Sequence, residues 1–223
     1  MTLAHSAVVL TLKGLTNLLC RIEDEELVRV PPGGPLILYT NHVNILEIPI
    51  IYTHLQPRPV TGMVAAVRWK NPFLAWLLNV VGAIPLHRGA ADIAALRSAI
   101  RRLAAGAIII IAPEGTRSGH GRLQEAHPGV VLLALRSGAA LQPAAFHGSE
   151  NYRDDLRRLR RTDFRITVGR PFHLDAGAVR VTRSIRREML DEMMYQLSAL
   201  LPAANRGIYS DLSAATTRYL NFA

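Results

Sequence analysis

The pattern of apolar and polar positions predicts strands and helices in alternation along the chain. Four consecutive isoleucines between Gly106 and Pro113 predict a buried strand over 107–112. Other apolar runs predict strands over 36–40, 60–67, 140–146 and 164–168, and 3.6-residue periodicity predicts helices over 3–19, from Asn44 onward, and over 71–81, 91–105, 130–136 and 181–200. Apolar strands that alternate with helices indicate a single α/β domain with a mostly parallel, covered sheet, preceded by an apolar N-terminal helix.

A histidine and a carboxylate follow the first of these strands, in the segment Asn41-His42-Val43-Asn44-Ile45-Leu46-Glu47. The end of a strand in an open α/β sheet is the usual place for catalytic groups. Five residues of regular helix turn by about 500°, so His42 and Glu47 can meet only if His42 precedes the helix and folds back over its first turn. Asn44 as the helix N-cap permits this. The pair then predicts a general base with its orienting acid.

The same spacing has a structural alternative. Asn44 and Glu47 are spaced as in a capping box, in which Glu47 would accept a hydrogen bond from a backbone N–H. The two roles are compatible, and the sequence leaves both open.

An anion site is predicted where the isoleucine strand ends, in Pro113-Glu114-Gly115-Thr116-Arg117-Ser118. Glycine allows close backbone approach, threonine adds a hydroxyl donor, and the arginine fork pairs with phosphate. Arg88, which closes the segment Gly82-Ala83-Ile84-Pro85-Leu86-His87-Arg88, is a second candidate. The alternatives are a surface turn with one exposed ion pair and a solvated arginine.

These segments, followed by Leu141-Gln142-Pro143-Ala144-Ala145-Phe146-His147-Gly148, resemble the four ordered blocks of glycerolipid acyltransferases of the lysophosphatidic acid acyltransferase type. The resemblance covers roughly residues 35–175. It implies transfer of a fatty acyl group from acyl-CoA or acyl carrier protein to the hydroxyl of lysophosphatidic acid or a related lysophospholipid, with no metal or other cofactor. It also implies that His42 is the base and Glu47 its partner, and that Arg88 and Glu114 to Arg117 (Glu114, Gly115, Thr116, Arg117) bind the acceptor phosphate. Within this block, Glu114 is expected to orient Arg117 by an ion pair.

Two positions depart from the family pattern. The histidine block usually ends in aspartate, whereas Glu47 is one methylene longer. Where the family often has a basic residue before a glycine, this chain has Ala126-His127-Pro128-Gly129. The first departure bears on the geometry of the base, and the second on the identity of the acceptor headgroup.

Charge favours an anionic partner. The formal net charge is +9, and all but two of the 26 basic residues are arginines. A dense cluster comprises Arg153, Arg157, Arg158, Arg160 and Arg161. A solvated helix face is the usual explanation, but attraction to anionic lipid, about 1 kcal/mol per basic residue near the surface, is the better functional interpretation. Nucleic acid is disfavoured because no helix-turn-helix, zinc or aromatic-stacking signature accompanies the charge.

The N-terminal helix is the predicted membrane contact. One apolar face carries Val8, Leu12, Leu15 and Leu19, but the segment is too short to span a bilayer, for which ~20 apolar residues are needed. The alternative is a helix that caps the core. A second apolar face, for membrane or acyl-chain contact or for core packing, comprises Trp69, Phe73, Trp76 and Leu77. These features predict a peripheral or monotopic membrane protein. Because the N-terminus lacks the early positive charge and small-residue cleavage site of a secretory signal, the cytoplasmic face is the default expectation.

The predicted division is therefore a membrane-associating helix over 1–22, an acyltransferase domain over 23–205 and a C-terminal tail of unclear role over 206–223. The one cysteine, Cys20, excludes an internal disulfide and is expected to be a buried thiol. Two other functions stay open. The histidine and glutamate can serve a lipid hydrolase or transacylase, or the site can be vestigial in a non-catalytic lipid-binding protein.

Overall fold

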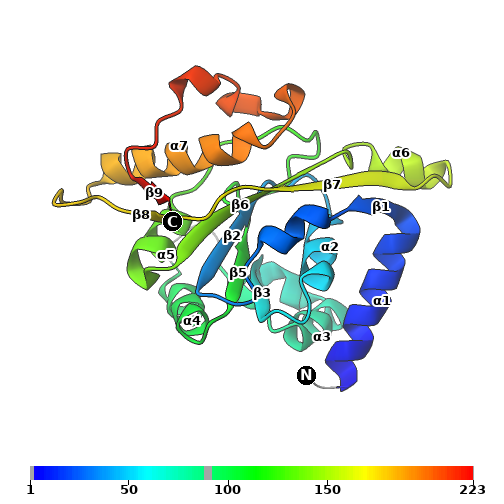
Figure 1. Cartoon of the computed structure of the whole chain (residues 1–223). Coiled ribbons are helices and arrows are strands. Elements are labelled where there is room, and N and C mark those ends of the chain that lie inside the picture. Colours follow the sequence, from blue (N-terminus) through cyan, green and yellow to red (C-terminus); the bar gives the residue numbers. More distant parts are fainter. Residues whose placement is uncertain (1–2, 88–91, 223) are drawn as a thin grey trace.

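One mixed sheet lies at the centre of the computed structural model, which describes residues 3–87 and 92–222 of the 223-residue chain (Figure 1). The strands are β1 Cys20–Glu23, β2 Leu36–Thr40, β3 Val60–Ala65, β4 Ile84–Leu86, β5 Ile108–Ile111, β6 Ala140–His147, β7 Thr162–Val168, β8 Phe172–Leu174 and β9 Leu220–Phe222. Their order is β1-β7-β6-β2-β5-β3-β4, with β8 pairing with β6 and β9 with β8. Strands β2 to β6 run parallel, whereas β7 and β8 are antiparallel to β6. The predicted α/β class with a mostly parallel sheet is confirmed.

Helices cover both faces of this sheet (Figure 1). They are α1 Leu3–Leu19, α2 Glu47–His54, α3 Pro72–Val80, α4 Ile93–Ala104, α5 Gly129–Ser137, α6 Tyr152–Arg157 and α7 Arg183–Ala199. Buried residues of α4, α5 and α7 form one apolar core with one face of the sheet, and those of α2 belong to a second core on the other face. Burial on both faces explains why the central strands are continuously apolar.

The two cores divide the central strands residue by residue. In β2, Ile37 and Tyr39 belong to the core with α7, while Leu36 and Leu38 belong to the core with α2. This is the two-residue alternation of a strand. The Tyr39 hydroxyl also donates to the carbonyl of Met193 in α7, at 2.9 Å. The sheet is thereby fixed to the helix that crosses it.

Two predicted boundaries shift for local reasons. The helix expected from Asn44 begins at Glu47, because the Asn44 side chain accepts the N–H of Leu46 (2.8 Å) and caps a bend instead of a helix. Strand β3 ends at Ala65, where its pairing with the three-residue β4 also ends, and 66–70 form a 3₁₀ helix. The strand predicted to 67 is therefore too long.

Five short elements are not predicted from the pattern: β1, β4, α6, β8 and β9. Each is six residues or fewer, too short to establish a period. The last of them gives the C-terminal segment a structural role. Strand β9 pairs with β8, and buried Glu192 of α7 accepts hydrogen bonds from the backbone N–H groups of Arg218 (2.8 Å) and Tyr219 (2.9 Å). The segment after residue 206 is thus tied to the sheet and to α7.

Helix α1 has one face on the domain and another face exposed. Val8 and Val9 are buried, and the ring of His5 is hydrogen-bonded to the Tyr52 hydroxyl of α2 at 2.8 Å. The outer face exposes Leu10 (75%) and Leu18 (70%). The predicted single stripe is therefore split, with Val8 buried and Leu15 and Leu19 exposed. Among the residues described, no helix has the length and apolarity needed to cross a membrane.

Candidate active site

His42 lies just beyond the carboxyl end of β2, in a loop held against β6. The side chain of Asn41 donates to the carbonyl of Phe146 (2.8 Å) and accepts the N–H of Phe146 (2.7 Å). This two-way bond continues the β2–β6 ladder through a side chain. The residue before the histidine is consequently fixed to the neighbouring strand.

The predicted pair is in contact. Nδ1 of His42 lies 2.9 Å from Oε2 of Glu47, the first residue of α2. The glutamate side chain is fully buried, whereas 21% of the histidine side chain is exposed. A carboxylate at Nδ1 favours the tautomer with its proton on that nitrogen, which leaves Nε2 as the basic atom.

Glu47 also has the structural role that its spacing allows. Its other oxygen, Oε1, accepts the backbone N–H of Asn44 at 2.7 Å. Burial raises the pKa of the carboxyl, and the hydrogen bonds from His42 and Asn44 oppose that shift. Each oxygen of the carboxylate therefore has a donor, and the loop and the imidazole are held by one buried group.

The Asn44 side chain makes further hydrogen bonds besides the one that it accepts from Leu46. Its amide nitrogen donates to the carbonyl and to the hydroxyl of Ser149, both at 2.9 Å. Ser149 follows β6 and is fully buried. Sequence reasoning missed Asn41 and Ser149 as supports of the site. The polar residues beside the histidine gave a signal for Asn41, but Ser149 is brought in only by the pairing of β6 with β2.

The glycine-containing turn after β5 lies against the histidine loop. The N–H of Ser118 donates to the carbonyl of His42 (2.8 Å), and that of Gly119 to the carbonyl of Val43 (3.0 Å). Gly115 has φ of +66°, a left-handed conformation that favours glycine, and the ring of His127 packs beside it. The structure thus brings the two motifs together, although His42 and Glu114 are 72 residues apart in the sequence.

Thr116 and Arg117 are exposed on this turn. In the part of the chain that the structure describes, the guanidinium of Arg117 makes no hydrogen bond and no ion pair with another residue. An exposed cation without an internal partner, next to the histidine loop, is available to an anionic ligand. Arg88, the second predicted phosphate residue, lies outside the described residues.

The expected ion pair between Glu114 and Arg117 is not formed among the described residues. Glu114 is 2% exposed, and its oxygens accept the backbone N–H groups of His42 and Gln124, both at 2.9 Å. Burial raises the pKa of Glu114 to about 7, against the effect of these hydrogen bonds. The Glu114 carboxylate therefore binds two backbone N–H groups instead of the Arg117 guanidinium.

Part of the arginine cluster is bonded within the protein. Arg157 pairs with Asp154 at 3.1 Å, and Arg161 donates to the carbonyls of Asn17 and Cys20, where α1 gives way to β1. The predicted burial of Cys20 is confirmed, and burial raises the pKa of its thiol to about 11. The cluster therefore holds the end of α1 as well as presenting charge.

The second predicted apolar face is partly solvent-exposed. Phe73 and Trp76 of α3 are 71% and 49% exposed, with ring centroids 6.1 Å apart. Trp69 is half-buried, and its indole N–H donates to Asn79 at 2.9 Å. The face thus presents two adjacent aromatic rings to the outside rather than to the core.

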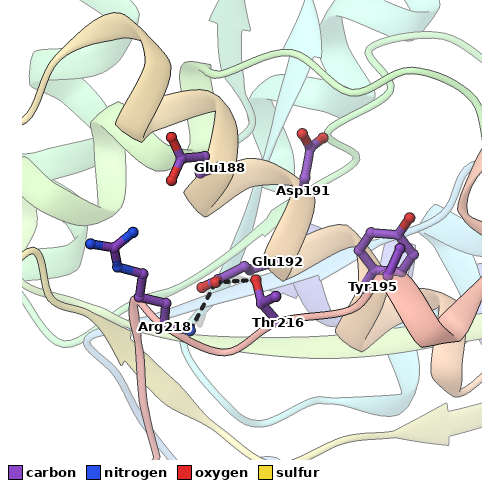
Figure 2. Close-up of a pocket in the computed structure, with 7 residues that line it drawn as sticks. Glu188, Asp191, Glu192, Tyr195, Thr216 and Arg218 are labelled. Atoms are coloured by element: carbon purple, nitrogen blue, oxygen red, sulfur yellow. Dashed lines mark hydrogen bonds between the residues drawn. The ribbon is translucent and has the colours of Figure 1, made fainter.

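Carboxylates also gather away from these motifs, in a hollow between α7 and the C-terminal segment (Figure 2). The hollow is lined by Glu188, Asp191, Glu192, Tyr195, Ala214, Thr216 and Arg218. The buried Glu192 is fully used in holding the C-terminal segment, with a further bond from the Thr216 hydroxyl at 2.5 Å. Across 3–87 and 92–222, no three His, Cys, Asp or Glu side chains are grouped as a metal site would need.

The His42–Glu47 pair and the exposed Arg117 thus lie on adjacent loops, at the carboxyl ends of the parallel strands β2 and β5. The chain belongs to the Acyltransferase family, whose sequence profile matches residues 21–147. The matched region includes both motifs and ends at the last residue of β6.

Known acyltransferases are similar to this chain over part of its length. One is the chloroplastic 1-acyl-sn-glycerol-3-phosphate acyltransferase LPAT1 of Arabidopsis thaliana, 28% identical over 133 residues, which are 58% of this chain and 36% of the relative. Another is the lyso-ornithine lipid O-acyltransferase of Pseudomonas aeruginosa, 29% identical over 125 residues, 56% of this chain and 46% of the relative. The chain thus spans between about a third and a half of the length of these relatives.

The fold is similar to that of a solved acyltransferase. The crystal structure of the 1-acyl-sn-glycerophosphate (LPA) acyltransferase PlsC from Thermotoga maritima superposes with a TM-score of 0.62, covering 88% of this chain and 79% of that one. Sequence identity is 18%, so this likeness concerns the fold.

Proposed function

We propose that the protein transfers a fatty acyl group from an acyl thioester to the free hydroxyl of a lysophospholipid. The observation that carries the proposal is the contact between His42 and the buried Glu47, next to a turn that exposes Arg117. This geometry offers proton abstraction and anion binding on adjacent loops. A phosphorylated alcohol acting as the nucleophile needs both.

In the proposed reaction the attacking oxygen comes from the acceptor. Nε2 of His42 takes the proton of the acceptor hydroxyl, whose oxygen forms a bond to the thioester carbonyl carbon. The tetrahedral oxyanion then collapses, the carbon–sulfur bond breaks, and the imidazolium returns the proton to the thiolate. Glu47 stabilises the imidazolium throughout and is not itself protonated. No acyl-enzyme forms, and backbone N–H groups near Gly115 or at the start of α2 are the candidate oxyanion donors.

Arg117 is the proposed acceptor phosphate ligand, with Thr116 and the backbone of Gly115 beside it and Arg88 as a second cation. The exposure of the Arg117 guanidinium supports this assignment. Lysophosphatidic acid is the first acceptor to test, because several relatives are named 1-acyl-sn-glycerol-3-phosphate acyltransferases. A lyso-ornithine lipid is the second, from the name of the Pseudomonas relative.

We also propose a membrane-associated protein, peripheral or monotopic, at the cytoplasmic face. The outer face of α1 exposes Leu3, Leu10 and Leu18, and α3 exposes Phe73 and Trp76. An apolar face of this kind lies in the interface plane, and basic residues add attraction to anionic lipid. The division proposed is accordingly a membrane-associating helix over 1–22, an acyltransferase domain over 23–205 and a C-terminal segment over 206–223.

The test is an acyl-transfer assay on the purified protein. Acyl-CoA and acyl carrier protein serve as donors, a panel of lysophospholipids and lyso-ornithine lipid as acceptors, and products are identified by mass spectrometry. We expect one thiol released per acyl group transferred, and only when acceptor is present. Thiol release without acceptor would indicate a hydrolase, acyl exchange without a thioester a transacylase, and lipid binding without turnover a carrier.

A further inference from the structure

Glu114 connects the two motifs of the proposed site without belonging to its surface. It follows β5, is 2% exposed, and directs its two oxygens to the backbone N–H groups of His42 and Gln124. The hydrogen bonds from Ser118 to the His42 carbonyl and from Gly119 to the Val43 carbonyl come from the same turn. Both backbone polar groups of His42 are therefore bonded to the segment 114–118.

The imidazole is thus held at two levels. Glu47 contacts the ring at Nδ1 and fixes its rotation, whereas Glu114 contacts the main chain from which the ring projects. Displacing that main chain would move Nε2 relative to an acceptor hydroxyl even with the Glu47 contact intact. Catalytic rates are sensitive to displacements of this kind, on the order of 10²-fold for ~1 Å.

We propose that Glu114 is a positioning residue for His42, and that the rate of acyl transfer depends on it although it contacts neither substrate. The proposal rests on the proposed acyltransferase function and takes Glu114 out of the acceptor phosphate site. An ionised carboxylate can accept both N–H groups, and such charge-assisted bonds are strong. A glutamine can accept only one, because its NH₂ group would face the second N–H donor.

The protonation of Glu114 gives the proposal a distinct pH signature. Burial and, to a smaller extent, the nearby Glu47 carboxylate raise its pKa to about 7. Other titratable or charged residues on the adjoining described segments include His42 from the β2–α2 loop, Arg117 from the same turn and His127, whose ring lies beside Gly115. As pH falls through about 7, Glu114 binds a proton and loses acceptor capacity for the two N–H groups. The rate of acyl transfer should therefore fall as Glu114 becomes protonated, and this part of the pH dependence should be absent when residue 114 cannot titrate.

The experiment compares Glu114→Gln and Glu114→Asp with Glu192→Gln as the matched control. Glu192 is equally buried (3% exposed) and also accepts backbone N–H groups, but it holds the C-terminal segment (Figure 2). We expect Glu114→Gln to lower kcat by about 10- to 100-fold with an acceptor KM within about twofold of wild type. The fall in rate around pH 7 that comes from Glu114 should be absent in this variant. Glu114→Asp, which keeps the charge, should recover part of kcat, and Glu192→Gln should keep both kcat and the pH profile.

A second readout separates this proposal from the proposed function. The backbone amide of His42 should be protected from hydrogen exchange in the wild type and lose protection in Glu114→Gln, whether or not the protein turns over substrate. Wild-type kcat and pH profile in a folded Glu114→Gln protein, or unchanged exchange at His42, would overturn the positioning role. Equal losses in kcat for the Glu192→Gln protein would do so as well. Loss of His42 protection in a protein that transfers no acyl group would instead sustain the positioning and reject the acyltransferase function.

Discussion

The carboxylate of Glu47 lies 2.9 Å from Nδ1 of His42. Its other oxygen accepts the backbone N–H of Asn44 at 2.7 Å, in the loop between the two residues. Glu47 is the first residue of α2, so its side chain reaches back over the loop that precedes the helix. With the side chain one methylene longer than the aspartate of the family pattern, the Glu47 carboxylate meets both donors. The departure seen in the sequence is thus accommodated by the local geometry.

Glu47→Gln should lower kcat by roughly 10²–10⁴, because the amide NH₂ group would favour the tautomer with the lone pair on Nδ1. Glu47→Asp should cost less, since it keeps the charge but is one methylene short of His42. Steady-state kinetics of the two folded variants provide the measurement. A glutamine variant as fast as wild type would remove Glu47 from the mechanism.

Replacing Arg117 by lysine keeps the charge but loses the planar fork. Acceptor kcat/KM should fall by the equivalent of ~1–3 kcal/mol, with donor KM nearly unchanged. Arg122→Lys is the control, because Arg122 is an exposed arginine of the same loop to which no role is assigned. Varying donor and acceptor in turn measures both effects. A rise in donor KM with unchanged acceptor kcat/KM would instead assign Arg117 to the donor site.

Gly115→Ala should destabilise the protein more than Gly119→Ala does. Both glycines have left-handed φ angles, +66° and +71°, so alanine costs about 1–2 kcal/mol at each. Only at Gly115 does a Cβ meet a neighbour, Cδ2 of His127 at 3.0 Å, whereas at Gly119 nothing lies within 4 Å. Urea denaturation of both variants measures the difference. Equal losses would mean that the His127 ring moves aside freely.

Glu114 should make the folded protein less stable as pH rises from about 4.5 to about 7. Its pKa is raised from 4.5 to about 7 in the folded state, so the folded protein binds this proton more tightly than the unfolded chain does. At ~1.4 kcal/mol per pKa unit, the free energy of unfolding falls by roughly 3 kcal/mol over that range from this group alone. Denaturation at several pH values should show a flatter dependence in Glu114→Gln. An unchanged slope would mean that Glu114 does not titrate there.

Membrane binding is best tested on the outer face of α1, because deleting the helix would also expose the core that Val8 and Val9 cover. Leu10→Gln with Leu18→Gln should weaken the binding to anionic vesicles that persists in high salt, since apolar burial is not screened. Ser6→Gln, at an exposed polar position of the same helix, is the control. Co-sedimentation at low and high salt gives the measurement. Wild-type binding by the double variant would locate the contact elsewhere.

The central strands were predictable from the sequence because strands that are buried on both faces consist mostly of apolar residues, as the four isoleucines of β5 do. The sequence also predicted that His42 and Glu47 would meet, since their spacing left one geometry in which they could. The short elements and the partner of Glu114 were not predictable in this way. Glu114 was assigned to Arg117, three residues away, but its donors are His42, 72 residues away, and Gln124, ten residues away. Neither the spacing nor the charge of residues 113–118 signals that Glu114 binds the backbone N–H groups of these two residues.

In the proposed mechanism His42 removes the proton from an acceptor hydroxyl. The most direct measurement is acceptor-dependent thiol release from an acyl thioester by His42→Ala, at saturating substrate and with the fold checked by circular dichroism. We expect a fall of about 10²–10⁴ in kcat, the contribution of a general base, with lipid binding retained. A folded His42→Ala protein that releases thiol at nearly the wild-type rate would rule out His42 as the general base.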